Sequence, residues 1–172
     1  MPIPEFIVEL RRHVGHAPLW LTGVTAVVLR GEGDEQEVLL VRRADTDEWS
    51  PVTGIVEPGQ EVHEAAVREV QEEASVVAAV ERLVWVSTTE PVRHANGDQA
   101  QYVDHTFRLR WVSGEPAVGD DENLEARWWP VRGVREGVPP MRDHFGDRVR
   151  VALDDPSDVL LGPTSGRHVR RG

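Results

Sequence analysis

The chain has 172 residues, of which 40% are hydrophobic and 28% are charged, and its formal net charge is −11. This size suits one domain, and the absence of cysteine and lysine excludes disulfides, thiolate nucleophiles and Schiff-base lysines. The acidic charge argues against a nucleic acid polymer as partner; with no run near 18 apolar residues and no signal peptide, we expect a cytoplasmic protein without a membrane span.

The spacing of apolar residues predicts two helices and three extended segments in the first half of the chain. A four-residue apolar spacing predicts a lead-in helix at residues 4–14. Two β-branched runs on either side of a polar segment predict a hairpin of residues 22–29 and 38–42. Residues 49–56 predict a further extended stretch. Residues 61–74 contain neither Gly nor Pro and predict a helix.

The second half predicts strands at residues 83–88, 102–112 and 127–131 and a final helix that Pro139-Pro140 opens. The first two strands are separated by turn residues, and an acidic loop precedes the third. Strands without alternating βαβ units indicate an α+β fold. We expect a lead-in helix, a main domain and a flexible tail, in residues 1–20, 21–153 and 154–172.

Three glutamates lie on one side of the helix predicted at residues 61–74. At 100° per residue, Glu72 lies at about 300° and Glu73 at about 40° from Glu69, so the carboxylates share a stripe about 100° wide. The neighbouring edge of the helix is apolar, with Ala66, Val67, Val70 and Ala74. Like charges this close repel, and a hard divalent cation would offset the repulsion. A solvated helix face is the alternative interpretation.

The residues around this helix resemble the Nudix box, G-x5-E-x7-R-E-U-x-E-E-x-G-U, in which U is aliphatic. The matching positions are Gly54, Arg68, Glu69, Val70, Glu72, Glu73 and Val76. Gln60 stands where the family has Glu and removes one charge near the metals. Ser75 stands where the family has Gly, just past the helix end, and costs about 1 kcal/mol there. The chain resembles MutT-like proteins, and its lead-in helix is similar to that of bacterial ADP-ribose or nucleoside-diphosphate pyrophosphatases.

This resemblance implies an α/β/α sandwich, a mixed β-sheet flanked by the box helix and a C-terminal helix. It also implies hydrolysis of the pyrophosphate bond in a nucleoside diphosphate linked to a group X, such as ADP-ribose, with Mg²⁺ or Mn²⁺ as cofactor. Arg68 would orient Glu69 through a hydrogen bond. The implied metal ligands are Glu69, Glu72, Glu73 and the backbone carbonyl of Thr53.

The general base stays open at this point. Glu122 is the first candidate, because it precedes Trp128 by six residues, a spacing at which the family often places a loop glutamate. Glu125 and Asp121 are the alternatives. Without a metal, each of these acids is equally well interpreted as a solvated loop residue.

The substrate contacts stay open as well. Arg43 suits a phosphate clamp, because a guanidinium matches two phosphate oxygens, and it equally suits a surface pair with Asp45 or Asp47. Trp49 and Tyr102 are candidates to stack a base.

Two other functions are compatible with the sequence. The chain could be a Nudix-fold module that senses a nucleotide with weak or lost catalysis, because Gln60 and Ser75 depart from the box. It could also be an acidic interaction protein whose glutamate stripe is surface only. The lead-in helix would suit a homodimer contact, as in similar proteins.

Overall fold

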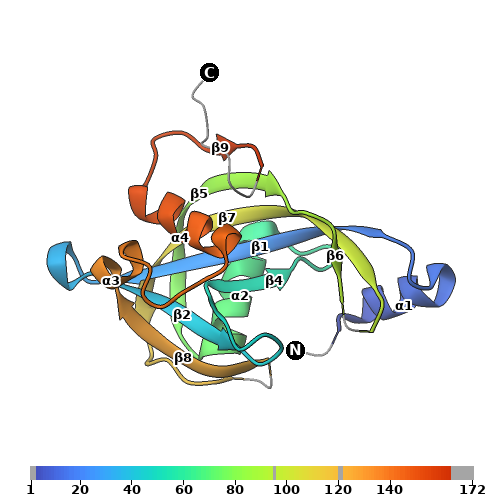
Figure 1. The fold of residues 1–172 in the computed structure, drawn as a ribbon, viewed down its shortest axis with the longest axis horizontal. Coiled ribbons are helices and arrows are strands. Elements are labelled where there is room, and N and C mark those ends of the chain that lie inside the picture. Colours follow the sequence, from blue (N-terminus) through green and yellow to red (C-terminus); the bar gives the residue numbers. More distant parts are fainter. Residues whose placement is uncertain (1–2, 95, 120–121, 164–172) are drawn as a thin grey trace.

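The computed structural model describes residues 3–94, 96–119 and 122–163 of the chain. A mixed sheet lies at the centre, with helix α2 (Val62–Ala74) against one face and helices α3 (Val131–Arg135) and α4 (Asp143–Asp154) against the other (Figure 1). Helix α1 (Glu5–Val14) lies at one end of the molecule, away from these layers. The expected α+β sandwich, with the glutamate helix and the C-terminal helix on its two sides, is confirmed.

In the described part of the chain the sheet contains nine strands, in the order β3-β2-β1-β7-β5-β9, with β4 joined to β1, β6 to β7 and β8 to β2. A short turn of 3-10 helix, η1 (Gly33–Glu35), separates β1 from β2. The strands are β1 (Leu19–Arg30), β2 (Glu37–Arg43), β3 (Trp49–Ser50), β4 (Val52–Ile55), β5 (Val77–Thr88), β6 (Val92–Arg93), β7 (Gln99–Ser113), β8 (Asn123–Pro130) and β9 (Leu160–Leu161).

The expected hairpin of the first two strands is much shorter than the sequence predicted. β1 and β2 share only the pairs of Leu29 with Val38 and Arg30 with Glu37, and β2 then turns away to pair with β8. β4 occupies the part of this edge of β1 that β2 does not cover, and it pairs antiparallel with residues 23–26 of β1. On its other edge β1 pairs in parallel with β7 along eleven residues. This splaying places β4 beside α2.

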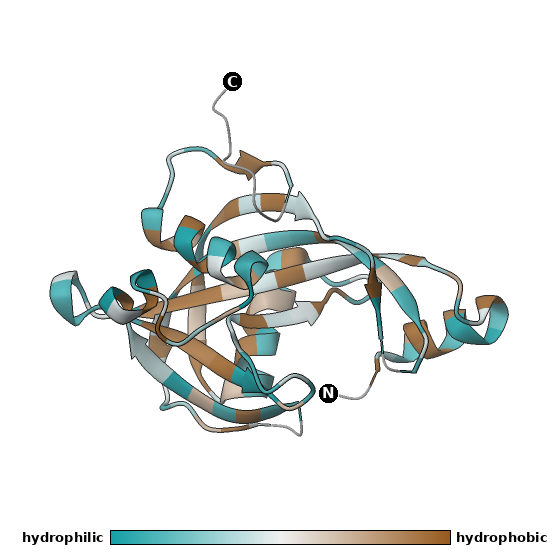
Figure 2. Cartoon of the chain, in the orientation of Figure 1, coloured by the Kyte–Doolittle hydropathy of each residue, from teal (hydrophilic) through white to brown (hydrophobic). Residues whose placement is uncertain are grey.

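Hydrophobic residues fill both faces of β1. Val24, Ala26 and Val28 pack with α2, whereas Val27 and Leu29 pack with α3 and α4. A strand that is covered on both faces reads as a continuous apolar run, which is why β1 lacks a polar alternation. In Figure 2 brown residues run along much of β1 and β2, whereas the helices carry alternating teal and brown bands.

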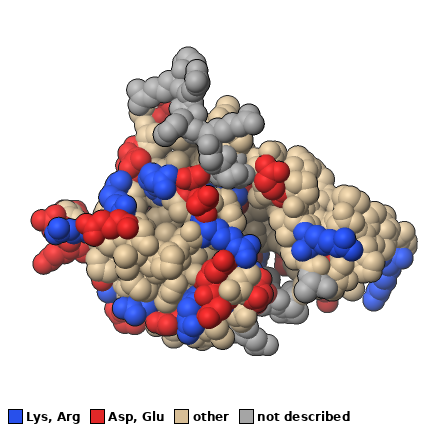
Figure 3. Space-filling model, viewed as in Figure 1, with Lys and Arg blue, Asp and Glu red and all other residues tan. Residues whose placement is uncertain are grey.

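Acidic and basic side chains are interleaved over the face seen in Figure 3. Surface pairs such as Arg42 with Asp47, at 2.6 Å, and Arg142 with Glu48, at 2.5 Å, join neighbouring segments. None of the helices in the described part of the chain is long and apolar enough to cross a membrane.

The tail contains structure that the sequence did not predict. Leu160 and Leu161 form β9, which pairs in parallel with Trp85 and Val86 of β5. The expected flexibility of the segment from residue 154 stays a prediction, and residues 164–172 lie outside the described part of the chain. The short helix α3 was also not expected, and the final helix begins at Asp143, after the two prolines.

Candidate active site

Helix α2 presents its three box glutamates to two different environments. On its apolar edge, Ala66 and Val70 are fully buried in the core. Glu69 and Glu73 are buried as well, with 1% and 4% of their surface exposed, whereas Glu72 is exposed. A purely solvated glutamate face is therefore excluded, because two of the three carboxylates have been taken out of water.

Glu69 is the most unusual group in the stripe. Arg68 Nη2 donates to its Oε1 at 2.9 Å, but no described residue hydrogen-bonds to its buried Oε2. Burial raises the pKa of Glu69 from 4.5 to about 7, against the lowering effect of Arg68. The negative charges of Glu72 and Glu122 raise this pKa further. The site therefore holds a carboxylate that lacks part of its counter-charge.

Gly54 makes room for this carboxylate. A Cβ atom on Gly54 would lie 2.0 Å from Cδ and 2.1 Å from Oε1 of Glu69, so any other residue here would force the Glu69 side chain to shift. The glycine of the box is therefore explained by a close approach between strand β4 and helix α2. Thr53, half-buried, precedes Gly54 in the same strand, next to this contact.

Arg68 links the glutamates to the end of β4. Its Nη1 donates to Glu72 Oε2 at 2.8 Å, and its Nη2 approaches the carbonyl oxygen of Ile55 at 3.3 Å. The same Nη2 lies 3.4 Å from Oε1 of Gln60, so the amide that replaces the family's glutamate also faces the arginine. This geometry fits the expected role of Arg68 in orienting Glu69.

Glu73 has a partner that the sequence did not indicate. Asn123 Nδ2 donates to Glu73 Oε2 at 2.9 Å, and both residues are buried. The preceding residue, Glu122, accepts a hydrogen bond at its backbone oxygen from the Ala44 amide at 2.7 Å. The Glu122 carboxylate acts on the pKa of Glu69, so the structure brings the first candidate for the base to the glutamate stripe.

One alternative base, Glu125, lies elsewhere. Glu125 points to two arginines, with oxygens 3.6 Å from Arg42 Nε and 3.6 Å from Arg127 Nη1. Asp121 lies outside the described residues.

Arg43 forms the pair with Asp45 that was one of its two interpretations, while its role as a phosphate clamp stays a prediction. It makes two hydrogen bonds of 3.0 Å to Asp45. Burial by itself would lower the pKa of Arg43, but the hydrogen bonds and charge of Asp45, followed by the charges of Glu73 and Glu122, raise it. Arg43, the last residue of β2, is therefore a positive charge within electrostatic range of Glu73 and Glu122.

The two aromatic candidates pack in different hydrophobic clusters. Burial raises the pKa of Tyr102, and the charges of Arg11 and then Arg43 act against the rise, so this ring lies within electrostatic range of both arginines. Trp49 packs edge-on against Trp129, with ring centroids 5.1 Å apart, in the core cluster beneath α4. The structure therefore does not bring Trp49 together with the glutamates.

The loop after β7 closes over the end of α2. The amides of Ala117 and Gly119 donate to the carbonyl oxygens of Ala74 and Glu73 at 3.0 and 3.2 Å. These bonds satisfy carbonyls that a helix end otherwise leaves unpaired. Ser75 ends the helix with φ 56° and ψ 23°, the left-handed conformation expected from the box.

The residues fit a divalent cation in their chemistry. Carboxylate oxygens are the ligands that Mg²⁺ prefers, and the buried Glu69 Oε2 without a hydrogen-bonding partner is the kind of atom that a cation would satisfy. Glu72 is turned toward Arg68, and among the described residues no three acidic or histidine side chains are already gathered as a ligand set. Glu72 therefore has to exchange Arg68 for a cation if it is to become a ligand.

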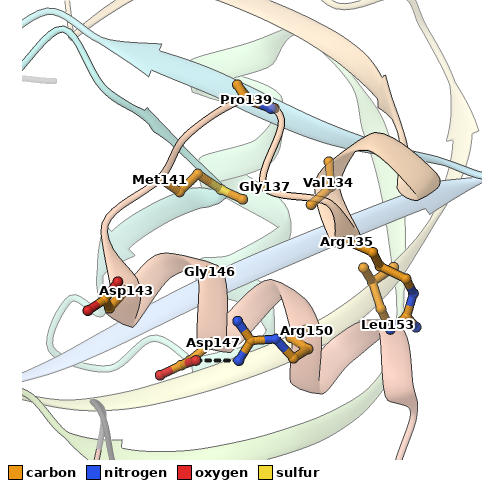
Figure 4. A pocket seen from close by; sticks show the side chains of 10 residues that line it. All are labelled: Val134, Arg135, Gly137, Pro139, Met141, Asp143, Gly146, Asp147, Arg150 and Leu153. Atoms are coloured by element: carbon orange, nitrogen blue, oxygen red, sulfur yellow. Dashed lines mark hydrogen bonds and ion pairs between the residues drawn. The ribbon is translucent and has the colours of Figure 1, made fainter.

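A hollow of about 250 Å³ lies away from these residues, between α3 and α4 (Figure 4). Three of its charged lining residues are paired, because Arg150 contacts Asp147 at 2.5 Å and Arg135 contacts Asp154 at 2.8 Å. None of the candidate site residues lines this hollow.

Comparison with known proteins gives a match to a family model described as NUDIX domain, over residues 20–149. The human 8-oxo-dGDP phosphatase NUDT18 is 31% identical over 148 residues, which are 82% of this chain and 39% of that protein. Dihydroneopterin triphosphate diphosphatase of Escherichia coli K12 is 36% identical over 66 residues, 38% of this chain and 44% of that protein.

A solved structure of the NUDIX domain of Shewanella oneidensis NrtR, complexed with ADP ribose, superposes with a TM-score of 0.62. It is 18% identical to this chain and covers 90% of it, while 98% of that structure is matched, which shows a shared fold. The chain spans less than half the length of the curated relatives it matches.

Proposed function

Because this chain belongs to the NUDIX domain family, we propose that it hydrolyses the pyrophosphate bond of a nucleoside diphosphate linked to a further group, with Mg²⁺ or Mn²⁺ as cofactor. The observation that carries the proposal is Glu69, a buried carboxylate with an unsatisfied oxygen, a raised pKa and a glycine that makes room for it. Two similar proteins are named 8-oxo-dGDP phosphatase and dihydroneopterin triphosphate diphosphatase, and these names support hydrolysis of a phosphoanhydride bond.

Glu69, Glu72, Glu73 and the Thr53 carbonyl would hold the cation. When bound, it would neutralise phosphate charge and lower the pKa of the attacking water. Arg68 holds Oε1 of Glu69 at 2.9 Å and so fixes this ligand's orientation.

Glu122 would accept the proton of the attacking water at its carboxylate, since its charge already acts on Glu69. Arg43 would bind phosphate oxygens through the two N–H groups that now hold Asp45. Asp45 competes for this arginine, so phosphate binding requires the pair to open. Tyr102, within range of Arg43, would contact the nucleoside side of the substrate.

The test is a panel of ADP-ribose, dinucleotides, nucleotide sugars and nucleoside triphosphates, incubated with and without Mg²⁺ or Mn²⁺. We expect turnover of at least one compound that depends on the cation and falls in Glu69→Gln. Absence of metal-dependent turnover across the panel would contradict the proposal.

A nucleotide-sensing module is the second candidate, and Gln60 favours it, because an amide replaces an acid facing Arg68. The NUDIX domain of NrtR, complexed with ADP ribose, supports a ligand of this kind. This function predicts thermal stabilisation by a nucleotide without hydrolysis, and gained activity in Gln60→Glu.

The proposal extends to a homodimer formed through helix α1. Val8, Leu10 and Val14 of this helix are each at least 40% exposed, so they offer apolar surface for such a contact. Light scattering of the chain and of Leu10→Glu tests this contact: a dimer that the substitution dissociates supports it, and a monomeric chain contradicts it.

A further inference from the structure

Asn123 stands out among the buried polar residues because it joins parts of the site that are distant in sequence. It is the first residue of β8 and is 6% exposed. Its Nδ2 donates to Oε2 of Glu73, fifty residues earlier, at 2.9 Å. A carboxamide cannot ionise, so this bond provides a fixed donor to a buried carboxylate.

The backbone of Asn123 is held independently of its side chain. It pairs with Arg43 at the irregular end of the β2–β8 ladder, and the Ala44 amide holds the carbonyl of the preceding Glu122 at 2.7 Å. The side-chain amide therefore projects from a fixed point of the sheet. A donor on a fixed backbone loses little conformational entropy when it orients a partner.

Two parts of the acidic segment that leads from β7 into β8 contact α2 at the same residue, Glu73. At one end, the Gly119 amide donates to the backbone oxygen of Glu73 at 3.2 Å. At the other end, Asn123 donates to its side chain. A Cβ atom on Gly119 would lie 1.8 Å from the Glu72 carbonyl oxygen, so the loop approaches the helix as closely as a glycine allows.

We infer that Asn123 is a positioning residue that fixes the Glu73 carboxylate for cation binding and, through the same contact, holds the Glu122 segment against α2. This inference rests on the proposed function, since it assigns Glu73 as a ligand of the cation. Residues that hydrogen-bond to a metal ligand commonly change metal affinity by about 10–100-fold when they are removed.

Direct Mn²⁺ titration of the full chain, without substrate, followed by electron paramagnetic resonance, tests the inference. Asn123→Ala is expected to weaken Mn²⁺ binding by about 10–100-fold. Asn123→Asp keeps the shape but loses the donor and places a carboxylate against Glu73, so we expect it to bind Mn²⁺ at least as weakly. Asn123→Gln retains an amide donor and is expected to recover part of the affinity.

Asn96→Ala is the matched control, because Asn96 also donates to a carboxylate, Asp98 at 3.0 Å, but on the exposed surface. We expect wild-type Mn²⁺ affinity for this variant. Thermal unfolding of each metal-free variant identifies the temperature at which all of them are folded for the titration. If Asn123→Ala does not fold, the Mn²⁺ affinities of Asn123→Asp and Asn123→Gln are compared instead, and the positioning role requires the weaker binding in Asn123→Asp.

The possible failures are distinguishable. Wild-type Mn²⁺ affinity in Asn123→Ala or Asn123→Asp would overturn the positioning role and leave the metal-dependent function intact. A wild-type chain that binds no Mn²⁺ would overturn the proposed function and this inference together.

Discussion

The buried carboxylate of Glu69 makes the stability of the metal-free protein depend on pH. Its pKa is raised from 4.5 to about 7, chiefly by burial, so folding favours the protonated form. A group whose folded pKa exceeds its unfolded pKa contributes stability that is fully present below about pH 4.5 and is lost as the pH rises through about 7. Because a shift of one pKa unit corresponds to about 1.4 kcal/mol, the loss of folding stability amounts to about 3 kcal/mol.

Glu69→Gln removes this dependence. The glutamine keeps an oxygen that can accept the hydrogen bond from Arg68, but it cannot ionise. In urea unfolding of the metal-free proteins from pH 5 to pH 8, we expect the stability of wild type to fall relative to the variant by about 2–3 kcal/mol. The variant should therefore be the more stable protein at pH 8, provided that the two are similar at pH 5.

Excess Mg²⁺ supplies the complementary measurement. A ligand that binds only the folded state stabilises it, so Mg²⁺ should restore stability to wild type at pH 8 and should have a smaller effect on Glu69→Gln. A stability difference between the two proteins that stays constant from pH 5 to pH 8 would refute the reasoning.

Two further substitutions test close contacts in the fold. The Cβ atom of Gly54→Ala would lie 2.0 Å from Cδ of Glu69 and would displace this carboxylate, so we expect kcat/KM on the preferred substrate to fall about 100-fold. Gly146→Ala, in α4 with open space around it, should leave activity unchanged, and equal loss in both variants would contradict the argument. Arg148→Ala removes the buried partner of Asp104, 3.4 Å away, and should cost about 3–5 kcal/mol in urea unfolding; a loss below about 1 kcal/mol would show that the pair is dispensable.

Helix α2 was predictable because its information is local. The spacing of its glutamates places them on one stripe, and the box residues identify the family that the match over residues 20–149 confirms. The burial of Glu69 was not predictable in the same way. It depends on β4 lying directly against α2 at Gly54, which in turn depends on β2 leaving the edge of β1.

The errors and omissions of the sequence interpretation have related causes. The predicted hairpin assumed that neighbouring strands stay paired, whereas β8 competes for β2 from more than 80 residues further along the chain. β9 has only two residues, too few for a periodic pattern, and α3 contains Gly133, which weakens a helix signal. Asn123 gave no signal beyond its place next to Glu122.

The sequence alone determined the fold class, the helix that carries the glutamates and the family to which the chain belongs, because these depend on residue types at short fixed spacings. Only the tertiary structure decided that Glu69 and Glu73 are buried while Glu72 is exposed, that Trp49 belongs to the core beneath α4, and that Asn123 reaches Glu73. Burial and long-range hydrogen bonds arise from contacts between segments far apart in the chain, and no local pattern encodes which segments will meet.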